Sequence, residues 1–485
     1  MPVSSLPSPH GIGTLGRAAY EFVDFLAEAG QSWWQLLPLG VTGYGDSPYS
    51  PLSTFAGNPY FIDLDMLIAD GLLTAEDVAV DFGSDCERVD YGLLFQNRLR
   101  VLRRACERGR ESRAEALAAF RRDNPWVEDY ALFMAAKAHF GMKSWCDWED
   151  EALKRRESGA LAKYRRLLAE DIELHGFLQM LFFDQWSRLK RYANDRGIRI
   201  LGDLPIYVAM DSADVWLEPE QFLLDGELRP TVVAGVPPDA FTADGQLWGN
   251  PIYDWERMRA EDFDWWMRRL DGVSRLYDAL RIDHFRGIDS YWAVPAGDTD
   301  ARGGAWRDGP GMALVERMKT RFPDLCFIAE DLGILTERVR QLVKAAGFPG
   351  MKVLEFAFDA SERSLYLPEY CTEDSVCFLG THDNDTVRGW EASLCEADRA
   401  FARDYMNITD DEGWCRGMIR TGMNTQSCLF IVQMQDILEL DGSARMNVPG
   451  TESGNWRWRM KPDALTPALA QKLRLYTVRS GRARG

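Results

Sequence analysis

The sequence predicts an α/β protein, a (β/α)8 TIM barrel with large, mostly helical insertions between the barrel strands. Short apolar runs alternate with helical segments in the second half of the chain, and this alternation is typical of a parallel sheet. Several of the runs end in charged residues, and barrel active sites lie at the ends of the strands. The length of 485 residues suits one barrel of about 250 residues with insertions.

Residues 1–64 are expected to begin the barrel. Residues 15–29 have helical apolar spacing, with Gly30 in the position of a C-terminal cap. Residues 34–39 are predicted to form a short buried strand, and a loop rich in Gly and Pro follows at 40–59. Another strand should precede the first helix. Because the chain starts at Met1-Pro2-Val3, we expect the first barrel strand to be shortened or missing.

Residues 65–195 are predicted to form a mostly helical insertion subdomain, since this block is charged and rich in Ala and ends in a long amphipathic helix. Residues 196–485 are expected to complete the barrel, with a lid-like insertion at about 206–275. Helices are predicted at 311–321 and 336–345. Together with 34–39, the predicted strands number seven, and the other six are residues 198–204, 280–285, 326–329, 351–356, 376–379 and 429–434.

Composition narrows the class of protein. The formal net charge of −19 argues against a surface for nucleic acid or for an anionic membrane. The nine cysteines contain no CxxC pair, which favours free thiols in a reducing compartment over disulfides or a zinc cage. The N-terminus does not look like a secretory signal, and no stretch is long and apolar enough to span a bilayer. A cytoplasmic location is therefore expected.

The motif Arg281-Ile282-Asp283-His284-Phe285 lies at the end of one predicted strand. Strand alternation would put Arg281, Asp283 and Phe285 on one side. An Arg on the same face can keep the Asp ionised, as a nucleophile requires. A purely structural Arg–Asp pair is the alternative.

The motif Phe327-Ile328-Ala329-Glu330-Asp331 delivers a carboxylate from an apolar strand just before a turn. Apolar surroundings favour the neutral form of Glu330, which could then act as a general acid near neutral pH. The alternative is a helix N-cap, a role that would fit Asp331 better than Glu330.

The motif Gly380-Thr381-His382-Asp383 marks a third strand end. His382 and Asp383 could bond hydroxyl groups and stabilise positive charge on a sugar ring. A metal site is the rival interpretation, but the chain lacks HxH, HxxxH and HxxE spacings here, so a metal site is not predicted. Carboxylates from successive strand ends are what glycoside cleavage needs, and a separation of about 5–5.5 Å would imply retention of configuration.

These motifs resemble those of the 4-α-glucanotransferases, also called amylomaltases or disproportionating enzymes, in glycoside hydrolase family 77 of the α-amylase clan. The resemblance covers nearly the whole chain. It includes the opening loop Ser4-Ser5-Leu6-Pro7-Ser8-Pro9-His10-Gly11-Ile12-Gly13 and the loops Gly43-Tyr44-Gly45-Asp46-Ser47-Pro48-Tyr49-Ser50 and Phe55-Ala56-Gly57-Asn58-Pro59-Tyr60. It also includes the segments Gly202-Asp203-Leu204-Pro205-Ile206-Tyr207-Val208, Val236-Pro237-Pro238-Asp239 and Gln246-Leu247-Trp248-Gly249-Asn250-Pro251.

The resemblance implies roles for individual residues. Asp283 would be the nucleophile, Glu330 the acid/base and Asp383 the stabiliser of the transition state. The other residues implied to bind substrate are Tyr44, Ser47, Tyr49, Asp203, Trp248, Arg281 and His382, with a role as loop anchors left open for Tyr44 and Trp248. The implied partners are α-1,4-glucans and maltooligosaccharides, with glucose as an acceptor. The resemblance also implies that no organic cofactor and no catalytic metal are needed, and the chain would be a monomer or a small homo-oligomer.

Three other functions stay open at this stage. An α-glucan hydrolase would share the covalent intermediate and differ only in using water as the attacking group. A non-catalytic glucan-binding protein would not need the carboxylates at 283, 330 and 383. A barrel metalloenzyme would lose activity with a chelator.

Overall fold

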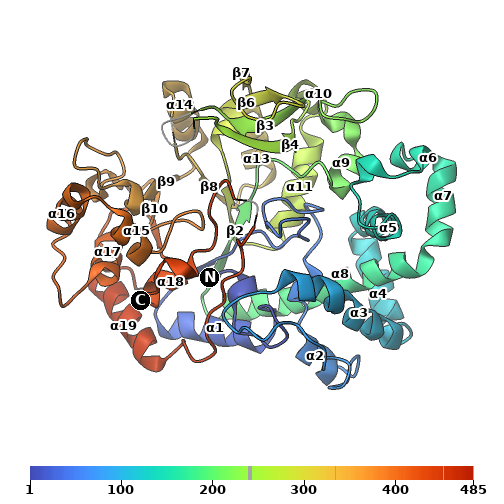
Figure 1. Cartoon of the computed structure of the whole chain (residues 1–485), viewed down its shortest axis with the longest axis horizontal. Helices are drawn as coiled ribbons and strands as arrows, with labels where there is room; N and C mark the ends of the chain where they lie inside the picture. The colour runs from blue at the N-terminus through green and yellow to red at the C-terminus, as the bar shows by residue number, and fades with distance from the viewer. Residues whose placement is uncertain (239–242, 334, 452, 484–485) are drawn as a thin grey trace.

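The computed structural model describes residues 1–238, 243–333, 335–451 and 453–483. Asp239, the last residue of the Val236-Pro237-Pro238-Asp239 motif, lies outside the described residues, as do three further residues of the predicted lid-like insertion. The described chain has parallel strands, one antiparallel sheet and two groups of helices (Figure 1).

All seven predicted strands are present, and all their pairings are parallel. They form two sheets, with the order β1-β2-β5-β8 in one and β11-β10-β9 in the other. The bounds are β1 Trp33–Gln35, β2 Arg199–Leu204, β5 Ala279–Ile282, β8 Cys326–Ala329, β9 Gly350–Val353, β10 Ser375–Phe378 and β11 Leu429–Ile431.

Four strands end three or more residues before their predicted carboxyl ends. β1 stops at Gln35, β5 stops at Ile282, β9 passes into a 3-10 turn at Leu354–Phe356, and β11 is followed by helix α18 (Met434–Ile437). Apolar runs do not mark these ends, because some apolar residues after each strand, such as Leu36 and Leu354, are buried by tertiary packing rather than by the sheet.

The two parallel sheets share one interior. The backbone N–H of Ala329, the last residue of β8, donates to the carbonyl of Pro349, just before β9, at 2.9 Å. Buried side chains from both sheets also pack into a single cluster, which consists of Leu201, Ala279, Ile328, Met351, Val353, Val376 and Phe378. Strands buried on both faces explain why their sequences are almost continuously apolar.

No strand precedes helix α1 (Arg17–Glu28) in residues 1–16, all of which are described; the chain makes only the 3-10 turn η1 there, at Val3–Ser5. The indole N–H of Trp34 on β1 donates to the carbonyl of Met1 at 2.6 Å. A cavity lined by Met1, Pro2, Gln35 and Ile431, among others, separates β1 from β11. The outer edges of β1 and β11 are therefore not paired with another strand of the described residues, at the place where the shortened first strand was expected.

Residues 64–195 are mostly helical. The long α8 lies below the strands in Figure 1, and α4 to α7 lie to the right of the strands. The bounds are α2 Leu64–Ala69, α3 Tyr91–Gly109, α4 Ala114–Asp123, α5 Trp126–His139, α6 Glu151–Lys154, α7 Ser158–Leu167 and α8 Ala169–Asp195.

An antiparallel sheet lies at the top of Figure 1 and has the order β4-β3-β6-β7. Its strands are β3 Val232–Val236, β4 Gln246–Pro251, β6 Ser290–Pro295 and β7 Ala305–Asp308. The helices nearby in sequence are α9 Ala213–Leu217, α10 Trp255–Ala260, α11 Asp264–Ser274, α12 Arg286–Asp289, α13 Met312–Arg321 and α14 Glu337–Ala346.

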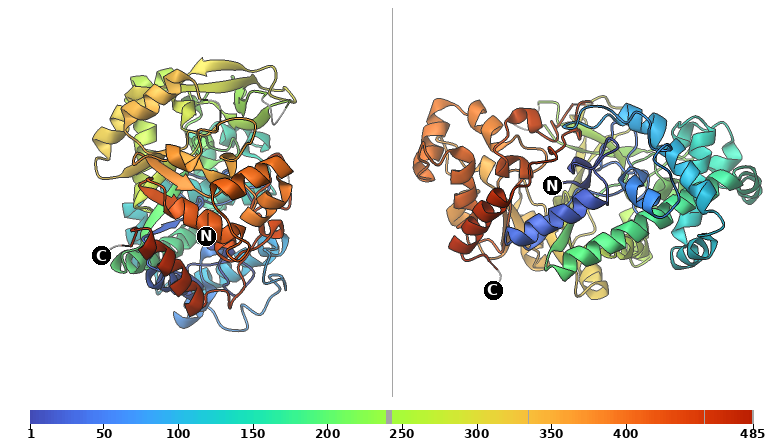
Figure 2. Two further views of the ribbon diagram at one scale, coloured as in Figure 1. Left: turned by 90° about the vertical axis from the view of Figure 1, so that its left-hand side faces the viewer. Right: turned by 90° about the horizontal axis from the view of Figure 1, so that it is seen from below.

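The C-terminal helices form a group at the opposite end of the molecule from α3–α7, as the right-hand view in Figure 2 shows. They are α15 Val387–Ser393, α16 Glu396–Tyr405, α17 Trp414–Met423, the short α18 and α19 Pro467–Arg479. Across the described part of the chain, no helix has both the length and the apolar character needed to cross a bilayer.

Candidate active site

Arg281 on β5 joins two carboxylates at the tips of neighbouring strands. Its Nη1 lies 2.7 and 2.8 Å from the two oxygens of Asp203 on β2, and its Nη2 lies 2.9 Å from Oδ1 of Asp283. Asp203 and Arg281 are direct partners in the sheet register and are both buried. The predicted pairing of Arg281 with Asp283 is therefore present.

The prediction that Phe285 shares a face with Arg281 and Asp283 is wrong. β5 ends at Ile282, and His284 has a left-handed backbone with φ of 51°. This turn breaks the strand alternation, so Phe285 instead packs edge-on against Phe348. A left-handed residue that is not glycine is strained, and such strain is concentrated at functional sites.

Glu330 follows β8 and is held by backbone donors. Its Oε2 accepts from the N–H of His284 at 2.6 Å, and its Oε1 accepts from the N–H of Leu332 at 2.8 Å. Burial raises the pKa of Glu330 to about 7, with the negative charge of Asp283 adding to the shift and Arg281 opposing it. A carboxyl group with this pKa can exchange a proton near neutral pH.

The alternative role of Asp331 as a helix N-cap is wrong. Asp331 accepts from the backbone N–H of Met351 at 2.7 Å, which ties β8 to β9. The cap of α14 is Thr336, whose hydroxyl accepts from the N–H of Val339.

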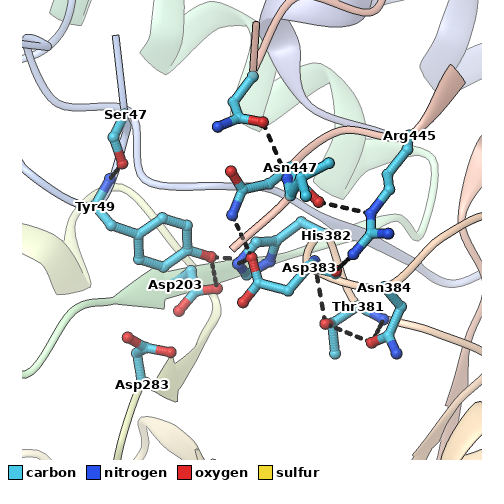
Figure 3. A network of polar contacts seen from close by, with 12 residues as sticks. Ser47, Tyr49, Asp203, Asp283, Thr381, His382, Asp383, Asn384, Arg445 and Asn447 are labelled. Atoms are coloured by element: carbon cyan, nitrogen blue, oxygen red, sulfur yellow. Dashed lines mark hydrogen bonds and ion pairs between the residues drawn. The ribbon is translucent and has the colours of Figure 1, made fainter. Parts of the chain in front are cut away.

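His382 and Asp383 follow β10, and the Tyr49 side chain connects His382 to Asp203, an ion-pair partner of Arg281 (Figure 3). The Tyr49 hydroxyl lies 2.8 Å from Asp203 Oδ2 and 3.1 Å from His382 Nδ1. The rings of Tyr49 and His382 also stack, with their centroids 4.7 Å apart. Three separate parts of the chain thus form one polar network around Asp283 and Asp383.

Sequence reasoning missed two residues that hold Asp383. The Asn447 side-chain amide donates to Asp383 Oδ1 at 2.6 Å. Arg445 donates to the backbone carbonyls of Asp383 at 2.6 Å and of Asn447 at 2.8 Å, as Figure 3 shows. This segment belongs to no strand and follows β10 by more than 60 residues, so no periodicity or strand-end signal identified it.

The remaining predicted residues lie around this network. The Ser47 hydroxyl accepts from the backbone N–H of Tyr49 at 3.2 Å, which shapes the turn before Tyr49. Tyr44 is fully exposed on the same loop. Trp248 on β4 is 37% exposed and meets the His284 ring edge-on, with centroids 4.8 Å apart. Burial lowers the pKa of His284 to about 4, so its imidazole is neutral at physiological pH.

No group of three or more His, Cys, Asp or Glu residues within the described ranges is arranged to hold a metal ion. The nine cysteines are all free thiols in the structure.

Comparison with known proteins decides the family. The family model described as 4-alpha-glucanotransferase, glycoside hydrolase family 77, matches residues 1–466. The chain belongs to this family. A 4-alpha-glucanotransferase from Clostridium butyricum is 47% identical over 486 residues, which cover 99% of this chain and 100% of the relative. A 4-alpha-glucanotransferase from Thermus thermophilus is 45% identical, with 97% of this chain and 96% of the relative covered.

A solved structure of a family member has nearly the same backbone. The amylomaltase from Streptococcus agalactiae, solved in complex with acarbose, superposes with a TM-score of 0.98 at 44% identity, covering 100% of this chain and 99% of that one. The chain is therefore a 4-alpha-glucanotransferase by family, by related sequences and by structure.

Proposed function

We propose that this 4-alpha-glucanotransferase moves a segment of a 1,4-α-glucan to the 4-hydroxyl of an acceptor glucose or glucan, with retention of configuration. The observation that carries this proposal is that two carboxyl groups, Asp283 after β5 and Glu330 after β8, lie at the ends of neighbouring strands in different environments. Asp283 is in contact with a buried Arg, whereas burial raises the pKa of Glu330 to about 7. Two carboxyl groups with environments this different are suited to act as nucleophile and acid/base.

In the first step, an oxygen of Asp283 attacks the anomeric carbon of the donor. The bond from that carbon to the glycosidic oxygen breaks, and Glu330 gives its proton to the departing oxygen. The product of this step is an ester between Asp283 and the glycosyl segment, together with the released glucan end. The contact with Arg281 at 2.9 Å orients Asp283 for attack.

In the second step, the ionised Glu330 takes the proton from the acceptor's 4-hydroxyl. The acceptor oxygen attacks the anomeric carbon, and the ester bond to Asp283 breaks. Two inversions give net retention, and Asp283 and Glu330 return to their starting states. The Leu332 and His284 N–H groups that bond Glu330 stabilise its ionised form between the steps.

The other residues of the network would bind the reacting glucose. Asp383, fixed by Asn447, would stabilise positive charge that develops on the ring in the transition state. Tyr49, Asp203 and His382 would bond its hydroxyls. Tyr44 and Ser47 would contribute to the donor side, and Trp248 to the acceptor path.

The architecture that we propose is a (β/α)8-type barrel that is open between β1 and β11. The shared interior of the two parallel sheets supports this view. Residues 65–195 would then be a helical insertion subdomain between barrel strands. Residues of about 206–275, which include β3 and β4, would be a lid-like insertion over the site.

The wider setting follows from the same reaction. The substrates would be α-1,4-glucans and maltooligosaccharides in the cytoplasm, with no cofactor, metal, nucleic acid or membrane involved. The protein would be a monomer or a small homo-oligomer.

Incubation with maltotriose alone, without added metal, tests the proposal. Transfer predicts glucose together with maltopentaose and longer chains, with no net gain of reducing ends. Glucose and maltose with rising reducing ends would instead establish an α-glucan hydrolase. Binding of maltooligosaccharides without any reaction would indicate a non-catalytic glucan-binding protein.

A further inference from the structure

Trp306 is a large aromatic residue that stays 44% exposed on β7, an edge strand of the antiparallel sheet. Trp248, also exposed, lies on β4 at the opposite edge of the same sheet. Contact between an indole ring and water is unfavourable, so a ligand that covers the ring gains binding free energy. The position of Trp306 relative to the catalytic groups therefore indicates which ligand could cover it.

The Trp306 ring is joined to the segment that follows the nucleophile. The guanidinium carbon of Arg286, three residues after Asp283, lies 4.1 Å from the centroid of the ring. Arg286 is itself nearly buried. Burial lowers the pKa of Arg286, and the charges of Asp289 and Glu330 oppose this shift, so Arg286 lies near enough to the acid/base for their charges to interact.

A second contact fixes the orientation of Trp306. Trp292 on β6 is its direct cross-strand partner, and their rings meet edge-on with centroids 5.3 Å apart. The Trp292 indole N–H donates to the carbonyl of Ala301 at 2.8 Å. A Cβ at Gly304 would lie 2.2 Å from that same indole nitrogen, so the close approach requires glycine here. Trp306 is thus a rigid aromatic surface whose position is set by its neighbours.

Both exposed indoles are tied to the acid/base side of the site. The Trp248 ring contacts the His284 ring, and the backbone N–H of His284 donates to Glu330. The Trp306 ring contacts Arg286, whose charge interacts with that of Glu330. In a glycosyl transfer, the acid/base carboxyl faces the departing chain and then the acceptor. Pyranose rings stack on flat aromatic faces, because the axial hydrogens of the sugar contact the π surface.

We propose that Trp306 is a binding platform for the acceptor glucan, stacking a glucose unit beyond the first one. The proposal rests on the transferase function and adds a residue that selects acceptors by length. Glucose as acceptor would fill the position next to Glu330 without reaching Trp306. Longer acceptors would gain the stacking contact.

The test measures transfer from unlabelled amylose to radiolabelled glucose or to radiolabelled maltotetraose, in the wild type and in Trp306→Ala. We expect the KM for maltotetraose to rise about tenfold, which corresponds to about 1.4 kcal/mol of lost binding. The KM for glucose should change much less. Trp306→Tyr should restore most of the affinity for maltotetraose, because it keeps an aromatic face.

Phe95→Ala is the matched control, since Phe95 is an exposed aromatic residue on α3; it should leave both KM values unchanged. Equal changes for glucose and maltotetraose in Trp306→Ala, or no change in either, would overturn the platform. If the wild type transfers no label to either acceptor, the proposed function fails instead, so the two failures are distinguishable.

Discussion

The tips of the two parallel sheets hold their carboxylates in different ways. In the sheet β1-β2-β5-β8, a single buried Arg281 makes ion pairs with both Asp203 and Asp283 at distances below 3 Å. In the sheet β9-β10-β11, Asp383 is held by the neutral amide of Asn447. Behind it, Glu355 and Asp436 are buried, and each has one oxygen without a hydrogen-bond partner among the described residues.

The two arrangements suit different roles in catalysis. A carboxylate in contact with an Arg is held in place by a charge-assisted hydrogen bond, which suits a nucleophile and a residue that bonds hydroxyls. Asp383 is held instead by the Asn447 amide and lies 3.3 Å from His382 Nε2, and no ion pair of the described residues joins it to an Arg or a Lys. Asp383 is therefore free to stabilise positive charge on the sugar.

Removing either reacting carboxyl should have the largest effect. We expect Asp283→Asn and Glu330→Gln each to lower kcat for maltotriose by about 10⁴-fold or more, because each removes a reacting group. With an α-maltosyl fluoride donor, fluoride release should recover in Glu330→Gln, since fluoride leaves without a proton, but should not recover in Asp283→Asn. The control Glu337→Gln changes an exposed residue. Equal recovery in both variants would contradict the assigned roles.

Removing Arg281 should disturb Asp203 and Asp283 at the ends of β2 and β5, but not Asp383 after β10. Arg281→Met leaves Asp203 buried without its ion pair, so we expect kcat to fall by about 100-fold and Tm to fall with it. Arg281 lowers the pKa of Glu330, so in this variant the alkaline limb of the rate profile should move to higher pH. Arg281→Lys serves as the control that keeps the charge. An alkaline limb that moves to lower pH in Arg281→Met would refute this electrostatic account.

Loosening Asp383 should affect the rate more than binding. A hydrogen bond to a charged group contributes about 1.5–3 kcal/mol, so Asn447→Ala should lower kcat by about 10- to 100-fold. KM for maltotriose should change by less than about threefold if the bond matters mainly in the transition state. The measurement is initial rate against maltotriose concentration, with Asn424→Ala, an exposed amide after helix α17, as the control. A rise in KM with kcat unchanged would place Asn447 in ground-state binding instead.

The pH dependence should follow Glu330. Its pKa is raised to about 7 by burial, and the first chemical step needs the protonated form. The rate, measured as kcat/KM for maltotriose, should therefore fall about tenfold per pH unit above pH 7. A plateau that extends beyond pH 9 would show that Glu330 does not supply the proton.

The smallest effect should come from Asp436. Burial raises its pKa to about 7, so the folded state binds a proton more tightly than the unfolded chain between about pH 4 and 7. The contribution of Asp436 to the free energy of unfolding then decreases as pH rises through this window. Asp436→Asn removes that loss and keeps an oxygen for the N–H of Val387. We expect Tm to rise by about 3 °C at pH 8 and to change little at pH 4.5, with exposed Asp411→Asn as the control.

Local sequence patterns predict the seven parallel strands, the long helix α8 and the position of Asp283, Glu330 and Asp383 at strand ends, and the structure has all of these features. They depend on local periodicity and on which residues follow an apolar run, and both can be read from the chain. The Arg281–Asp283 pair is of the same kind. Asp283 follows β5 directly and its N–H still bonds the Leu204 carbonyl of β2, so it keeps the strand spacing that puts residues i and i+2 on one face.

Where those strands end, and what holds the carboxylates, depends on contacts between segments that are distant in sequence. The left-handed backbone at His284 redirects Phe285, and Asp331 bonds β9 rather than capping a helix. Asn447 and Arg445 reach Asp383 from 64 and 62 residues away, and Trp306 on β7 contacts Arg286 on α12. Such contacts depend on how separate segments pack, and no periodicity within one segment encodes the partner that another segment brings.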